Sequence, residues 1–190
     1  MRKIIVANLA SLDGFIAGPN GEIDWFNVDK EFERYAVDFI STVDTMLYGR
    51  VTYQLMAGYW PTASATENDP RIIDAMNSFP KVVFSKTLNK VEWKNARLVK
   101  DDIGGEISRL KQQPGKNMVI YGSGTIVSQL SQMGLIDEYR IFVSPIILGN
   151  GRQQFENIDH KLDLKLLETK TFGTGMVLLH YVAASQKQSN

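Results

Sequence analysis

The amino-acid sequence predicts a three-layer α/β fold, in which a central, mostly parallel mixed β-sheet carries helices on both faces. Two observations predict it. Short apolar runs that are typical of buried strands alternate along the chain with segments of helical periodicity, and this alternation builds parallel sheets covered by helices. The chain then ends in two strand patterns, 164–172 and 176–184, on either side of Gly173-Thr174-Gly175, which is typical of an antiparallel hairpin.

The first half of the chain supplies two of the predicted strands and three helices. The run from Ile4 to Ala10 is apolar except for Asn8, a pattern typical of a strand buried on both faces. A loop with several glycines follows it. The next predicted elements are a helix with apolar positions from Phe32 to Val43 behind an Asp29 N-cap, a strand over 45–48, and helices over 50–56 and 72–79, the last entered at Asp69-Pro70.

The second half continues the alternation up to the terminal hairpin. The predicted elements are strands over 81–85 and 97–99, a helix over 103–110, a strand over 117–121, a helix with Ile126, Val127, Leu130 and Met133 on its buried face, and a strand over 138–147. No change of composition typical of a linker divides the chain, so we expect residues 1–184 to form one domain. Residues 185–190 form a polar tail.

Composition excludes several classes of function. The chain has 190 residues, with 21 Lys and Arg against 21 Asp and Glu, so its formal net charge is zero and favours neither nucleic acid nor an anionic membrane as partner. It contains no cysteine, which excludes disulfides, thiolate metal sites and a cysteine nucleophile. Its two histidines, His160 and His180, have no metal-ligand spacing, so no metal site is expected. Without a signal peptide or an apolar run of ~20 residues, a cytoplasmic location is expected.

Three turns at the ends of predicted strands carry the residue types that bind phosphates. Gly122-Ser123-Gly124-Thr125 opens a helix, where free backbone N–H groups and the helix dipole attract anions. Gly49-Arg50-Val51-Thr52 also opens a helix, and Phe84-Ser85-Lys86-Thr87 adds two hydroxyls and an ammonium. Taken alone, the first turn is equally consistent with a tight turn that needs glycine, and the other two are more readily explained as solvated surface side chains. Together, at one edge of a sheet, they indicate a ligand with several phosphates, such as a dinucleotide.

The loop after the first strand starts at the same edge. Ser11-Leu12-Asp13-Gly14-Phe15-Ile16-Ala17-Gly18 combines a carboxylate, apolar side chains and glycines, as expected of a lid over a flat ring. Asp13 is also an ordinary residue for an Asp-Gly turn. Trp25 and Trp60 could stack on a ring or fill the core.

Six segments along the chain form one pattern in register. They are 11–17, Tyr48-Gly49-Arg50-Val51-Thr52-Tyr53, 80–88, Tyr121-Gly122-Ser123-Gly124-Thr125-Ile126, Gly134-Leu135-Ile136-Asp137-Glu138-Tyr139, and Pro145-Ile146-Ile147-Leu148-Gly149-Asn150-Gly151. In this order they resemble the dihydrofolate reductase superfamily, most closely the branch of the C-terminal reductase domain of riboflavin biosynthesis. The resemblance spans the chain from about Arg2 to about Val182.

The resemblance implies NADPH as cofactor and a mixed sheet of about eight strands. It implies that Gly122, Ser123, Gly124 and Thr125 hold the pyrophosphate. Further cofactor contacts are implied for Gly49, Arg50 and Thr52 (a second phosphate turn), Ser85 and Lys86 (the 2′-phosphate), and Leu9 and Ile16 (the nicotinamide).

The substrate side departs from the family pattern. Riboflavin-pathway reductases usually carry Glu just before the glycine turn, where this chain has Tyr121. Asp13 is the predicted catalytic carboxylate, with Asp29 and Glu33 as alternatives for holding the substrate. The expected function is NADPH-dependent reduction of a small heterocycle, most like 5-amino-6-(5-phosphoribosylamino)uracil. Reduction of a pterin or dihydrofolate, and a nucleotide-binding module without catalysis, remain alternatives. A homodimer is also expected, because the strand segment 139–148 and the hairpin after it offer long apolar strands at the edge of the sheet.

Overall fold

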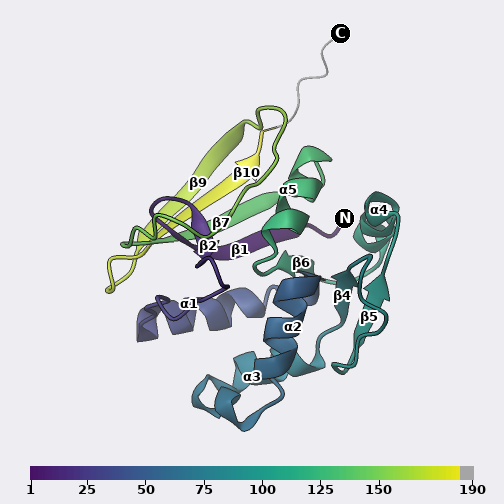
Figure 1. Cartoon of the computed structure of the whole chain (residues 1–190), viewed down its shortest axis with the longest axis horizontal. Helices are drawn as coiled ribbons and strands as arrows, with labels where there is room; N and C mark the ends of the chain where they lie inside the picture. The colour runs from purple at the N-terminus through teal and green to yellow at the C-terminus, as the bar shows by residue number, and fades with distance from the viewer. Residues whose placement is uncertain (185–190) are drawn as a thin grey trace.

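A single eight-stranded sheet forms the centre of the molecule. The computed structural model describes residues 1–184, and its strands lie in the order β5-β4-β3-β6-β1-β7-β10-β9 (Figure 1). The strands are β1 (Ile4–Ser11), β3 (Val43–Gly49), β4 (Lys81–Phe84), β5 (Ala96–Val99), β6 (Asn117–Ile120), β7 (Glu138–Ser144), β9 (Leu164–Thr171) and β10 (Val177–Ala183). The predicted tail, 185–190, lies outside the described residues.

The sheet is parallel from β5 to β7 and antiparallel beyond. β1 pairs in parallel with β6 and β7, whereas β10 runs antiparallel to both β7 and β9. This confirms the mostly parallel mixed sheet with a C-terminal hairpin. The expectation that the strand starting near Glu138 lies at the sheet's edge is wrong, because β10 pairs along its outer side and leaves β9 as the edge strand.

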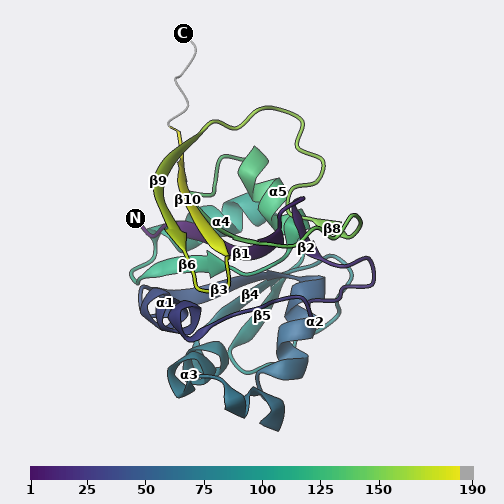
Figure 2. The same cartoon turned by 90° about the vertical axis from the view of Figure 1, so that its left-hand side faces the viewer.

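Helices cover both faces, which completes the three predicted layers (Figure 2). On one face, α1 (Lys30–Ile40), α2 (Arg50–Tyr59) and α3 (Pro70–Ser78) bury a core that includes Ile5, Met46 and Phe142. On the other face, α4 (Ile103–Gln112) and α5 (Gly124–Gln132) cover a core that includes Ile4 and Val6. Alternate residues of β1 therefore face opposite cores, which is why its sequence is apolar without alternation.

Three details of the predicted elements are corrected by the structure. Val43 begins β3 rather than ending α1, because Ser41 caps the helix at its carboxyl end. Met133 caps α5 and is 49% exposed rather than facing the core. The strand predicted over 138–147 ends at Ser144, before Pro145, which has no N–H to donate to a neighbouring strand.

A small second sheet joins the loop after β1 to a loop far along the chain. β2 (Phe15–Ala17) pairs antiparallel with β8 (Arg152–Gln153). Both strands are too short for sequence periodicity to predict them, as is the 3₁₀-helix η1 (Ala63–Glu67). The pairing places residues 152–153 above the carboxyl end of β1.

Lys81, the first residue of β4, is completely buried in the α1–α3 layer. Its Nζ donates to the carbonyl oxygens of Phe79 (2.7 Å), Asn77 (3.2 Å) and Lys94 (3.3 Å). It also lies 4.4 Å from the centre of the Trp93 ring. Burial away from water lowers the pKa of Lys81 to about 8.

This shift predicts a specific dependence of stability on pH. Between about pH 8 and 10.5 the unfolded chain keeps a proton on Lys81 that the folded chain has released, so the free energy of unfolding rises with pH in this window. We expect Lys81→Met to lose that rise. At pH 7 the free energy of unfolding of the Lys81→Met variant should also be lower by about 1–3 kcal/mol, because three carbonyl oxygens lose their hydrogen-bond donor. Urea unfolding of both proteins at pH 7, 8, 9 and 10 measures this; a constant difference between them would contradict the assignment.

No helix among residues 1–184 is both long enough and apolar enough to cross a bilayer. Within the same residues, no three His, Asp or Glu side chains converge in a way that could hold a metal ion.

Candidate active site

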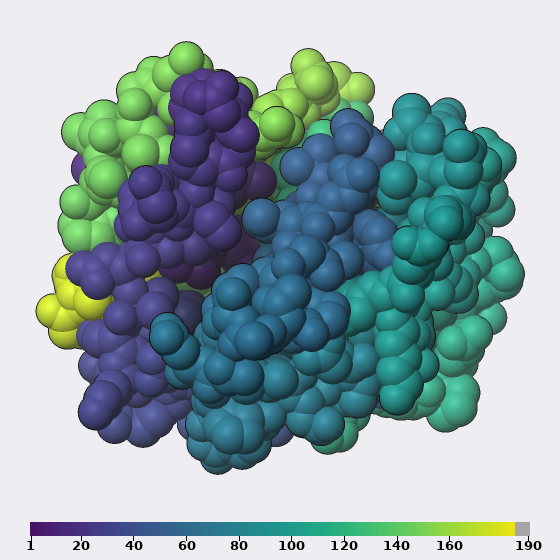
Figure 3. All heavy atoms as spheres, turned by 60° about the horizontal axis from the view of Figure 1, so that its bottom comes forward, coloured from purple at the N-terminus to yellow at the C-terminus, as the bar shows by residue number. Residues whose placement is uncertain are grey.

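A cavity of about 430 Å³ opens where the carboxyl ends of β1, β3 and β6 meet the two-stranded β2–β8 sheet. In the space-filling view the surface is hollowed between the purple N-terminal segment and the blue α2 (Figure 3). This is the edge of the sheet at which ligands of open α/β folds bind. The lining residues come from β1, the loop around β2, α2, the end of β4, the turn before α5, and β8.

Two helices begin at this cavity without a capping side chain. The N-cap residue of α2 is Gly49 and that of α5 is Ser123, and neither makes a side-chain cap hydrogen bond. The other three α-helices are capped by aspartates, namely Asp29, Asp69 and Asp102. The first turns of α2 and α5 thus present unpaired N–H groups and two positive dipole ends to the cavity, which suits an anion.

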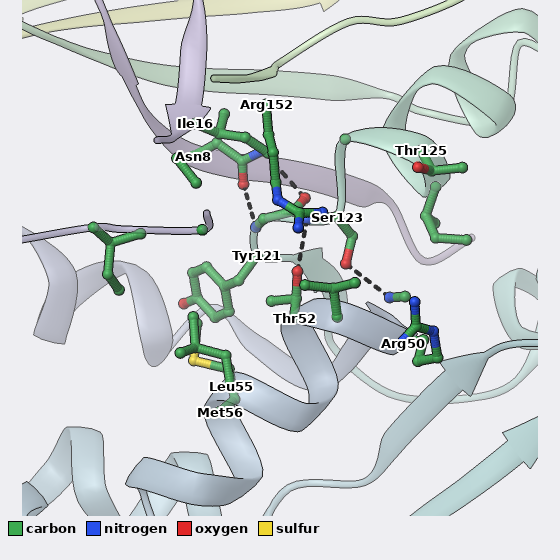
Figure 4. A pocket seen from close by; sticks show the side chains of 18 of the residues that line it. Asn8, Ile16, Arg50, Thr52, Leu55, Met56, Tyr121, Ser123, Thr125 and Arg152 are labelled. Atoms are coloured by element: carbon green, nitrogen blue, oxygen red, sulfur yellow. Dashed lines mark hydrogen bonds between the residues drawn. The ribbon is translucent and has the colours of Figure 1, made fainter. Parts of the chain in front are cut away.

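The two turns are fixed to each other by hydrogen bonds (Figure 4). Gly49 N donates to Ser123 Oγ at 2.7 Å, and Ser123 N donates to Thr52 Oγ1 at 2.9 Å. Gly122 and Ser123 both have left-handed backbone, with φ of 60° and 57°. A Cβ on Gly122 would lie 2.9 Å from Thr52 Oγ1, so both its conformation and the available space require glycine.

Asn8 fixes the glycine turn to β1 by hydrogen bonds. Its Oδ1 accepts from Gly122 N at 2.6 Å, and its Nδ2 donates to Gly122 O at 3.2 Å and to Gln154 Oε1 at 2.9 Å. Asn8 is 3% exposed. In the sequence, Asn8 is visible only as an interruption of an apolar run, and a polar residue inside such a run is the signal that indicates this role.

Three charged side chains line the cavity. Arg50 is the first residue of α2, and Arg152, from β8, extends into the cavity above Thr52 and the Ser123 turn (Figure 4). Glu156 is the one carboxylate among the described lining residues. The two cations beside two helix N-termini make this end of the cavity attractive to phosphate. Sequence reasoning missed Arg152, because its place depends on the β2–β8 pairing.

All the predicted cofactor residues except Lys86 line this one cavity. They are Leu9, Ile16, Gly49, Arg50, Thr52, Ser85, Gly122, Ser123, Gly124 and Thr125. Lys86 is exposed and is not part of the lining. The turn that contains it also differs from the other two, since no helix begins there and Ser85 Oγ accepts the N–H groups of Thr87 and Leu88.

Gly124 lies in close contact with the backbone at the end of β8. Its φ is not positive, and a Cβ there would lie 2.6 Å from the backbone oxygen of Gln153. The glycine therefore lets β8 approach the start of α5. A Gly124→Val variant would displace the chain's own backbone, so it does not isolate a phosphate contact.

The three carboxylates considered for the substrate lie outside the cavity lining. Asp13 accepts from Ser11 Oγ at 2.6 Å, Gly149 N at 2.7 Å and Leu148 N at 3.1 Å. These hydrogen bonds, led by that of Ser11, lower the pKa of Asp13, whereas a proton donor needs a raised pKa. Asp29 caps α1, and Glu33 is exposed on that helix. The placement of Asp13 favours a role in fixing the loop at 148–149.

The other end of the cavity is apolar. It is lined by Ala7, Leu9, Ile23, Phe26, Leu55 and Met56, with Tyr121 beside them. Figure 4 shows the Tyr121 ring next to Leu55 and Met56, on the other side of the Gly122–Ser123 turn from Arg50. The cavity thus has a polar arm at the helix N-termini and an apolar arm over the α1–α2 side of the sheet.

Comparison with known proteins agrees with this architecture. The family model of the RibD C-terminal domain matches residues 2–178. Over 180 residues the chain is 34% identical to the uncharacterized protein YyaP of Bacillus subtilis (strain 168), covering 95% of this chain and 94% of YyaP.

Solved structures show the same fold. A candidate riboflavin biosynthesis protein from Shewanella sp. PV-4 superposes with a TM-score of 0.74 and 26% identity, over 97% of this chain and 99% of that one. A deaminase/5-amino-6-(5-phosphoribosylamino)uracil reductase from Thermotoga maritima gives 0.69 and 16%, over 96% and 57%. Dihydrofolate reductase from Enterococcus faecalis, complexed with NADP(H), gives 0.63 and 13%, over 95% and 96%. The chain therefore belongs to the RibD C-terminal domain family, and it shares its fold with dihydrofolate reductase.

Proposed function

We propose that the protein is an NADPH-dependent reductase of a small heterocyclic compound. The observation that carries the proposal is the two-armed cavity, which combines two uncapped helix N-termini and two arginines with an adjoining apolar arm. Phosphates suit the first arm and a flat, uncharged ring suits the second. A nicotinamide dinucleotide carries both the phosphates and a flat ring, so a single ligand could occupy both arms.

The residues present fit such a cofactor. The free N–H groups of α2 and α5, with Arg152, would hold the pyrophosphate, and Arg50 with Ser85 would contact the 2′-phosphate. Leu9 and Ile16 would flank the nicotinamide. When bound, NADPH supplies a hydride. The chain's contribution is to align the acceptor carbon in the apolar arm and to exclude water from it.

The proposed substrate class is a flat heterocycle with a reducible C=O or C=N bond. Support for 5-amino-6-(5-phosphoribosylamino)uracil comes from family membership and from the activity named for the Thermotoga maritima relative. Dihydrofolate is tested beside it, because dihydrofolate reductase shares the fold.

Two measurements test the proposal. NADPH binding is followed by the fluorescence of the protein's tryptophans, and turnover by loss of NADPH absorbance with each candidate substrate. We expect tight NADPH binding and oxidation with at least one heterocycle. Absence of NADPH binding would refute the proposal, whereas binding without turnover across a broad panel of pyrimidines and pterins would favour a nucleotide-binding module.

We also propose that the protein is a homodimer through β9. This edge strand exposes Leu164, Leu166 and Leu167 at 39%, 48% and 51%, and an apolar edge strand is a liability in a monomer. Light scattering should give twice the chain mass of 21.4 kDa. Leu167→Glu should give a folded monomer; a dimeric variant would exclude this edge. Leu178 of the neighbouring strand β10 is fully buried and therefore unsuitable for this test.

A further inference from the structure

The apolar arm of the cavity contains one polar side chain that is free to contact a ligand. Asn8 also lines the cavity, but both its amide oxygen and its amide nitrogen are engaged with Gly122 and Gln154. The remaining residues of the arm are apolar apart from Tyr121. A ring bound there therefore meets the Tyr121 hydroxyl as its one side-chain hydrogen-bonding group.

Tyr121 lines the cavity, and its hydroxyl makes no hydrogen bond to another described residue. Among the described residues, the fully buried polar side-chain atoms without a hydrogen-bond partner are Arg140 Nε, Ser144 Oγ, Gln154 Nε2 and Thr174 Oγ1. The Tyr121 hydroxyl is not one of them, so its oxygen is not fully buried. Its ring packs against the α1–α3 core. The ring of this lining residue is therefore held in place, while its hydroxyl has no partner among the described residues.

We propose that the Tyr121 hydroxyl donates a hydrogen bond to the acceptor heteroatom of the substrate and supplies the proton that completes its reduction. This inference rests on the proposed function. A C=O or C=N carbon that accepts a hydride passes its π electrons to the heteroatom, which then needs one proton. The Tyr121 O–H bond breaks, the proton joins the heteroatom, and the phenolate recovers a proton from water.

The surroundings suit this role. Burial raises the pKa of Tyr121, so its hydroxyl stays protonated at neutral and mildly alkaline pH. An alkoxide or amide anion is more basic than a phenolate, so proton transfer from the phenol to the reduced substrate is favourable.

The same arm defines the class of ring that it accepts. It holds no cation that could pair with a carboxylate or phosphate; Arg50 and Arg152 lie in the polar arm. The reducible ring must therefore be uncharged, and any anionic substituent must extend out of the apolar arm.

The test compares wild type with Tyr121→Phe, which keeps the ring and removes only the hydroxyl. Uracil and pterin serve as probes, and their dissociation constants are measured by calorimetry on the NADP⁺-loaded protein. We expect the variant to bind the probes about three- to ten-fold more weakly, as for one lost hydrogen bond. NADPH affinity should stay unchanged, and kcat with the substrate found for wild type should fall about 100-fold.

Tyr139→Phe is the matched control. It removes the hydroxyl of another buried tyrosine, which donates to Ser131 Oγ on the opposite face of the sheet. This variant should therefore change neither the affinity for the probes nor kcat. If Tyr121→Phe leaves probe affinity and kcat unchanged, the proposal is overturned. If it weakens probe and NADPH binding in parallel, the hydroxyl has a structural role, and the proposal is overturned as well. Failure of wild type to bind either ring would also overturn it. The probes are also titrated into the cofactor-free protein; if the rings bind there but NADPH does not bind, the proposed function fails while the ring contact stands.

Discussion

Arg152→Ala is expected to weaken NADPH and NADH binding by a similar factor, whereas Arg50→Ala weakens NADPH much more than NADH. Arg152 enters the cavity above the Ser123 turn, where the pyrophosphate that both cofactors share would lie. Arg50 lies at the start of α2, on the side of Ser85, where only NADPH would place a phosphate. A charge-assisted hydrogen bond contributes about 1.5–3 kcal/mol, so each loss should be about 10- to 100-fold.

Fluorescence titrations with both cofactors measure the effect. Arg34→Ala is the control, since Arg34 is exposed on α1 and outside the cavity lining. Lys86→Ala should cost less than Arg50→Ala, because Lys86 does not line the cavity. If Arg50→Ala weakens both cofactors equally, Arg50 does not read the 2′-phosphate. If Arg152→Ala leaves both unchanged, β8 takes no part in cofactor binding.

The fold could be predicted because each of its main helices and strands has a recognisable pattern in its own stretch of sequence. The apolar run of β1 and the helical periodicity of α1 each identify an element without knowledge of its neighbours. The turn before α5 could be predicted too, because glycine in the sequence is typical of the positive φ that Gly122 adopts. These local signals placed most of the predicted cofactor residues on one edge of the sheet.

What the sequence could not supply depends on contacts between distant segments. Arg152 reaches the cavity only because β8 pairs with β2, and a two-residue strand has no periodicity. Asp13 looked catalytic because of its place in the loop, yet its oxygens are used by backbone N–H groups some 135 positions away. Whether a carboxylate is free or engaged is a tertiary property, and residue type alone does not reveal it.

Asn8→Ala is expected to lower both the stability of the protein and its affinity for NADPH. The substitution removes three hydrogen bonds at a buried site and leaves the Gly122 N–H without its partner. A loss of about 3 kcal/mol in the free energy of unfolding follows, since each unpaired buried group costs about 1–3 kcal/mol. Because Gly122 would no longer be fixed, the N–H groups of the α5 turn lose their alignment, and NADPH affinity should fall about ten-fold or more.

Asn117→Ala is the matched control for this effect. Asn117 accepts a backbone N–H from Lys3 at the opposite end of the same β1–β6 pair, far from the cavity. It should lose about 1 kcal/mol of stability and no cofactor affinity. Urea unfolding and fluorescence titration of both variants separate the two roles. If Asn8→Ala is destabilised but binds NADPH as wild type does, the glycine turn keeps its shape without Asn8, and the asparagine serves folding alone.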